Sequence, residues 1–65
     1  MPGMSAHAEL SSVATALEEM EQRIAAIANG LVGAEREELS ADLFEVERAL
    51  GAAARRLSRA LGTRR

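Results

Sequence analysis

Carboxylates and one histidine are the side chains of this chain that could take part in acid–base or metal chemistry. The densest carboxylate run is Glu18-Glu19-Met20-Glu21, and the histidine is His7. Successive residues of a helix point in different directions, so these carboxylates cannot converge on one ion. The chain has no Cys and no Glu-x-x-His spacing of the kind that holds di-iron centres in helix bundles. We therefore expect no catalytic residue, no metal site and no cofactor, and we interpret the chain as non-enzymatic.

Arginine offers the other possible chemistry, because all eight basic residues are Arg. Five of them gather near the C-terminus and could contact phosphate groups: Arg55, Arg56, Arg59, Arg64 and Arg65. However, the formal net charge is −2, and no aromatic residue lies among these arginines to stack on bases. Nucleic-acid binding through this cluster is therefore an alternative function and not the main prediction.

The elements that carry these residues are expected to be helices, because the chain is rich in Ala, Leu, Glu and Arg. Apolar residues recur at alternating spacings of four and three, which is the heptad pattern of packed helices. In the first half they are Ala6, Leu10, Val13, Leu17, Met20, Ile24 and Ile27. In the second half they are Leu39, Leu43, Val46, Leu50, Ala53, Leu57 and Ala60. Leu10, Leu17, Ile24, Leu43, Leu50 and Leu57 occupy heptad position a.

A turn is expected between the two runs, at Asn29-Gly30-Leu31-Val32-Gly33. Gly30 can adopt the left-handed conformation that ends many helices, and Glu35, Glu37 and Glu38 favour the start of a new one. The sequence thus predicts a single all-α domain over residues 1–65, an antiparallel two-helix hairpin. Its parts are a helix over about 5–29, a turn at 30–33, a helix over about 34–61, and frayed tails at 1–4 and 62–65.

The two heptad runs also predict a register. If the chain folds back at residues 31 and 32, each a residue faces a d residue of the other helix, and their two residue numbers add up to 63. Leu43, for example, faces Met20. The a and d rows should then form the contact between the helices. Opposite charges at the flanking g positions are expected to pair across it: Glu9 with Arg56, and Arg23 with Asp42.

One flank of the predicted hairpin is rich in small residues, and Phe44, the single aromatic residue, lies on it. Gly51 within a helix costs about 1 kcal/mol relative to Ala, which a close approach by a second helix would explain. We therefore predict that this flank is a partner interface outside the contact between the two helices. Its predicted members are Phe44, Glu47, Gly51, Ala54, Ser58, Leu61, Ala14, Ala25 and Ala28.

Charge is segregated along the chain, because all ten acidic residues lie between Glu9 and Glu47 and six arginines follow. Two hairpins packed head to tail in a four-helix bundle would bring opposite charges together. We expect a homodimer of this kind, which could also dock a larger protein. The longest uncharged internal stretch, residues 24–34, is too short to span a membrane and no secretory signal is evident, so we expect no membrane partner and a cytoplasmic location.

Overall fold

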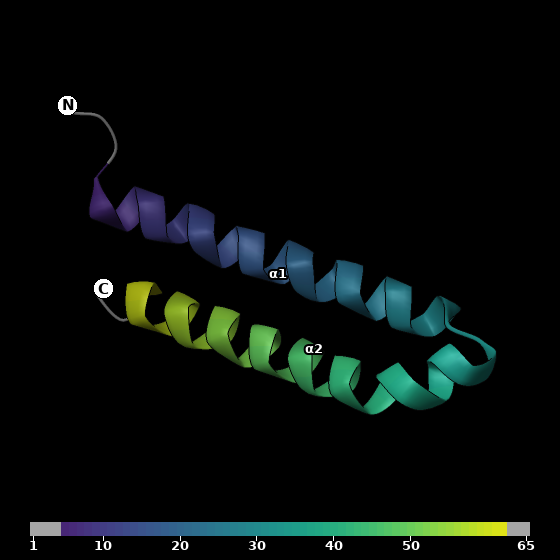
Figure 1. The fold of residues 1–65 in the computed structure, drawn as a ribbon. Coiled ribbons are helices and arrows are strands. Elements are labelled where there is room, and N and C mark those ends of the chain that lie inside the picture. The colour runs from purple at the N-terminus through teal and green to yellow at the C-terminus, as the bar shows by residue number, and fades with distance from the viewer. Residues whose placement is uncertain (1–4, 63–65) are drawn as a thin grey trace.

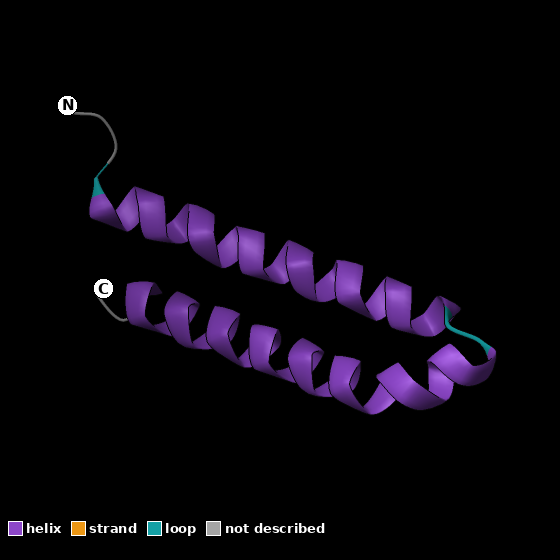
Figure 2. Ribbon diagram, viewed as in Figure 1, coloured by secondary structure: helices purple, strands orange, loops and turns teal. Residues whose placement is uncertain are grey.

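Two α-helices make up the part of the chain that the structure describes, residues 5–62 of a computed structural model. Helix α1 spans Ala6–Gly30 and helix α2 spans Gly33–Gly62, and no strand occurs within residues 5–62. The helices lie side by side and run in opposite directions (Figure 1), joined by a short loop at Leu31 and Val32 (Figure 2). The predicted all-helical class and both helix bounds, to within one residue, are confirmed.

The predicted tails need one correction, because Gly62 belongs to α2 and is not part of a tail. Residues 1–4 and 63–65 lie outside the described residues. Neither α1 nor α2, over the residues described, is long and apolar enough to cross a membrane.

The start of α1 is capped by Ser5. Its side-chain Oγ accepts a hydrogen bond from the backbone N–H of Ala8 at 3.1 Å, which satisfies one of the donors that a helix N-terminus leaves open. Glu9 places a negative charge in the same first turn, where the helix dipole favours it. The N-terminal end of α1 is therefore fixed by local interactions.

Ser5→Ala should remove this cap without disturbing any packed side chain, because Ser5 is exposed. We expect the free energy of unfolding to fall by about 1 kcal/mol. Thermal denaturation followed by circular dichroism would measure the loss, and Ser5→Asp, which restores an oxygen acceptor, should recover most of it. Equal stability of the Ala and Asp variants would contradict the role of the cap.

The turn differs from the predicted one, because a different glycine takes the left-handed conformation. Helix α1 continues through Gly30, and the N–H of Leu31 donates to the carbonyl of Ala28 at 3.2 Å. Leu31 is extended, and Gly33 has the positive φ of 62°. The carbonyl of Val32 then accepts from Arg36 N–H at 3.4 Å in the first turn of α2. The turn thus depends on Gly33 and not on Gly30.

The hairpin is an open rod with very little interior. Its principal dimensions are 49 × 24 × 12 Å, and its radius of gyration is 15.3 Å. A compact domain of this length would have a radius of gyration of about 11 Å. The buried hydrophobic residues of the described chain are Ala14 and Ala54, and no large side chain is fully buried. The two helices therefore meet along a line of contact and do not enclose a hydrophobic core.

Candidate helix-docking face

The contact between α1 and α2, here called the seam, uses the a and e rows of the heptads. Its most buried side chains are small ones at e, namely Ala14 at 6% exposed and Ala54 at 1%. Gly51, at the neighbouring b position, is also buried. The rest of the seam consists of half-buried residues from the same two rows: Leu17, Glu21, Ile24, Ala28, Ser40, Leu43, Glu47, Leu50, Leu57 and Leu61.

The d row, which we predicted to lie in the seam, faces solvent instead. Val13, Met20, Ile27, Leu39 and Val46 are all more than two-fifths exposed. With 100° of rotation per residue, replacing d by e turns each helix by about 50° about its axis. The prediction is therefore correct for the a row except Leu10, which is 41% exposed, and wrong for the d row.

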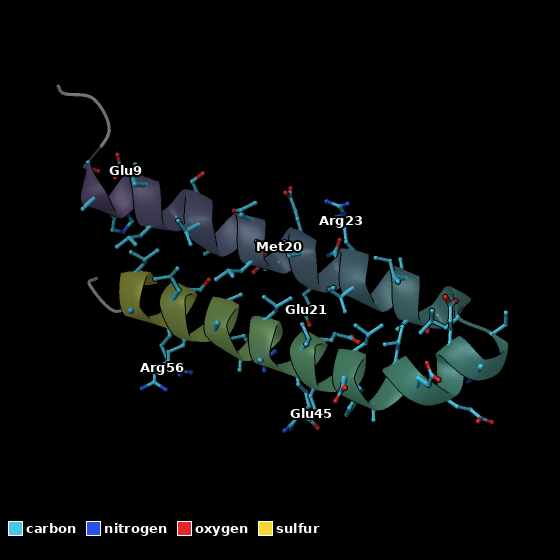
Figure 3. The ribbon with its side chains drawn as sticks, in the orientation of Figure 1. Glu9, Met20, Glu21, Arg23, Glu45 and Arg56 are labelled. Carbon is cyan, nitrogen blue, oxygen red and sulfur yellow. The ribbon has the colours of Figure 1, made fainter. Side chains whose placement is uncertain are left out.

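Small side chains explain why the helices turn this way. A Cβ added to Gly51 would lie 2.7 Å from Oε2 of Glu21, so the glycine makes room for the carboxylate that α1 points toward α2 (Figure 3). Ala14 and Ala54 likewise let the two backbones approach. Since dispersion attraction falls quickly with separation, closely spaced backbones make many short contacts even without large side chains.

This geometry corrects the predicted partner interface. Its premise was that the small residues lie outside the seam, whereas the structure places most of them within it. Phe44 and Ser58 are the exposed members. Ala14, Gly51 and Ala54 are buried in the seam, and Ala25, Ala28, Glu47 and Leu61 are half-buried. The three buried members are covered by the other helix of the hairpin, whereas the half-buried members are partly accessible.

The register is also shifted from the predicted one. His7 Nε2 donates to the carbonyl oxygen of Leu61 at 3.4 Å, whereas the predicted register places residue 56 opposite His7. Glu21 lies against Gly51, where residue 42 was expected. Both contacts lie further along α2 than the predicted register places them, by five positions at His7 and by nine at Glu21.

The shift and the rotation together remove the predicted charge pairs. Glu9 and Arg23 point away from α2, and Arg56 points away from α1 (Figure 3). Neither Glu9 with Arg56 nor Arg23 with Asp42 forms an ion pair in residues 5–62. The ion pair of the described chain is an exposed one within α2, between Arg48 and Glu45 at 3.6 Å, and such pairs contribute little to stability.

Large exposed hydrophobic side chains collect on one side of the rod. Equivalent heptad positions of two antiparallel helices lie on the same face of the pair, because an approximate two-fold axis perpendicular to their plane relates them. The d rows of α1 and α2 therefore border one common surface, together with Leu10. We call it the apolar face; it consists of Leu10, Val13, Met20, Ile27, Leu39 and Val46, exposed by 41% to 53%.

A shallow hollow marks the α1 side of this face. Its volume is ≈ 200 Å³, and Met20, Arg23, Ile24 and Ile27 line it. Three of these four residues are apolar, and the half-buried Ile24 connects the hollow to the seam. A hollow of this size and chemistry suits an apolar side chain from another helix.

The opposite face is mostly polar. A hollow of ≈ 270 Å³ lies there, with His7, Ser11, Thr15, Glu18 and Ser58 in its lining. Phe44, at position b and 58% exposed, is an isolated large apolar side chain on this side. No group of three or more His, Asp or Glu side chains in the described residues is placed to hold a metal ion.

The arginine cluster is only partly within the described residues. Arg55, Arg56 and Arg59 are exposed near the C-terminal end of α2, while Arg64 and Arg65 lie outside the described part of the chain. The three described arginines form no ion pair with a residue of 5–62. They are therefore available to an acidic surface of another molecule.

The exposed area of the rod is larger than its mass predicts. The chain exposes 4903 Å², whereas a folded monomer of 6.9 kDa exposes about 4000 Å². Comparison of the chain with protein-family models, curated proteins and solved structures finds no match.

Proposed function

We propose that this chain is a non-enzymatic interaction module that self-associates through its apolar face. Two hairpins would bring their apolar faces together and form a four-helix bundle as a homodimer. The observation that carries the proposal is the apolar face itself: six large hydrophobic side chains are exposed on one side of a rod that buries none completely. A larger protein that offers an apolar helix is the other occupant that this face could accept.

The energetics of the isolated hairpin support association. Ordering a residue costs roughly 1.5 kcal/mol, and burial of apolar surface returns about 25 cal/mol per Å². The described chain has Ala14 and Ala54 as its buried hydrophobic residues, so this return is small. The chain has no Cys and therefore no disulfide to compensate. Burial of the apolar face against a second chain would supply the missing stabilisation.

The heptad rows also provide the separate contact sides that each helix of a four-helix bundle needs. Each helix of such a bundle has two neighbours and one side toward the centre. Here the a and e rows contact the other helix of the hairpin, which leaves the d row, with g beside it, for a neighbour from another chain. The half-buried a residues, such as Leu17 and Leu50, would then complete their burial at the centre.

A concentration series of the wild-type chain tests the proposal. If unfolding is coupled to dissociation, two chains of 65 residues unfold with an enthalpy of about 90 kcal/mol. Mass action then lowers the midpoint of thermal unfolding by about 10 °C for each hundredfold dilution. Sedimentation equilibrium at tens of micromolar should show the mass of a dimer. A well-folded monomer, with a midpoint independent of concentration, would refute self-association.

A further inference from the structure

We infer that the two copies in the proposed dimer lie antiparallel, so that the basic end of each hairpin covers the acidic turn end of the other. This inference rests on the proposed function, because it assumes that the apolar face binds a second copy. It goes further than the head-to-tail packing expected from the sequence, because it names the charged residues that select this orientation on the apolar face.

The charge of the rod differs strongly between its two halves. In the observed register the middle of the rod lies near residues 17–18 of α1 and 50–51 of α2. The half with the helix ends, residues 6–17 and 51–62, contains three arginines and one acid, Glu9, for a net charge of +2. The half with the turn, residues 18–50, contains nine acids and three arginines, for a net charge of −6.

The apolar face does not by itself choose an orientation, but these charges do. A parallel dimer would place the two halves of charge −6 side by side. An antiparallel dimer places each of them beside a half of charge +2. Neighbouring helices in a bundle lie about 8–10 Å apart, within about one screening length at 0.1 M salt, so the difference is not screened out.

The g positions form a second row, which borders the apolar face on its outer edges. We call it the outer row; it consists of Glu9, Ala16 and Arg23 on α1, and of Asp42, Ala49 and Arg56 on α2. Its four charged residues form no ion pair within residues 5–62, and the three that Figure 3 labels, Glu9, Arg23 and Arg56, point away from the other helix of the hairpin. These side chains are therefore placed to meet a neighbouring chain.

The two orientations bring different outer rows together. In the antiparallel dimer each helix lies beside its own copy, so that Glu9 approaches Arg23 of the second copy, and Asp42 approaches Arg56. In the parallel dimer α1 lies beside α2 of the second copy, so that Glu9 approaches Arg56, and Arg23 approaches Asp42. Since each orientation forms its own set of pairs, exchanges of charge can distinguish them.

Two double variants with unchanged net charge make the test. Arg23→Glu with Asp42→Arg turns every antiparallel outer-row pair into a repulsive one and keeps the parallel pairs attractive. Glu9→Arg with Arg23→Glu does the reverse. We expect the first variant to raise the dissociation constant of the dimer at least about tenfold and the second to change it less than about threefold. A first variant that binds as tightly as the second would overturn the antiparallel orientation.

A distance measurement gives an independent readout. The chain has no Cys, so Val32→Cys in the turn, where Val32 is 74% exposed, accepts one spin label per chain. The antiparallel dimer places the two labels about 40 Å apart, near the length of α1, whereas the parallel dimer places them within about 20 Å. A short distance would refute the orientation and leave the proposed function standing. The absence of any intermolecular distance at tens of micromolar would refute the proposed function itself.

Discussion

Met20→Glu should abolish the proposed dimer while leaving the helical propensity of the chain intact. In the hairpin Met20 is 46% exposed, and Glu is as good a helix former as Met, so the substitution costs the single chain little. In the dimer it replaces a buried apolar side chain by a charge, once in each copy. Each loss is about 2 kcal/mol or more, so the dissociation constant should rise roughly a thousandfold.

Phe44→Glu is the matched control, because it introduces the same charge at a large side chain of similar exposure on the opposite face. We expect it to leave the dissociation constant unchanged within error. Sedimentation equilibrium of both variants, with circular dichroism at matched concentrations, would measure the difference. If Phe44→Glu dissociated the dimer and Met20→Glu did not, self-association would occur through the face that contains Phe44, which the heptad pattern predicts as the partner interface.

The heptad spacing was sufficient to predict the two helices, but not which rows pack together. Both the d row and the e row lie beside the a row, and a hairpin can close on either. Large residues such as Val13 and Met20 favour d when only two helices are considered. Small ones such as Ala14 and Ala54 favour e because they let the backbones approach. The sequence signal for the observed seam is a set of small residues, Ala14 and Ala28 at e on α1 and Ala54 at e on α2, but the same residues also fit an external interface.

The register could not be predicted because it depends on the turn. The a residues recur every seven positions, so a small change in where the chain reverses produces another register with similar pairing. Placing the left-handed residue at Gly33 rather than Gly30 lets α1 continue to Gly30. His7 then meets Leu61, five positions beyond residue 56, which the predicted register placed opposite it. The predicted ion pairs require both the predicted rows and the predicted register, and therefore they do not form.

The apolar face is exposed because the observed seam differs from the predicted one. The apolar residues of the two heptad runs are predicted to form the interior of the hairpin, and five of the six a residues are half-buried, Leu10 being the exception. Their d row is exposed because the two helices contact each other through their a and e rows. No further helix within residues 5–62 covers the d row. The predicted seam of a and d rows thus includes the d row, which the proposed four-helix bundle would bury between two hairpins.

Substitutions at Gly51 should test the seam directly. Gly51→Ala should be tolerated, because the atom that its Cβ would meet is the end of the flexible Glu21 side chain, which can swing outward. Alanine also gains up to about 1 kcal/mol of helix propensity. Gly51→Leu should instead force the backbones apart, at a cost of about 1–3 kcal/mol from overpacking. For a domain of this size each kcal/mol lowers the unfolding midpoint by about 4–8 °C.

Gly30→Leu is the control for this series, because Gly30 lies in the same hairpin and has open space around its Cα. The substitution adds the same side chain, at the last residue of α1, without entering the seam. We therefore expect Gly30→Leu to unfold well above Gly51→Leu, with Gly51→Ala at or above the wild type. Equal stability of the two leucine variants would show that Gly51 does not lie between the helices. The seam would then be the one of a and d rows, and the d residues of the apolar face would belong to the interior of the hairpin.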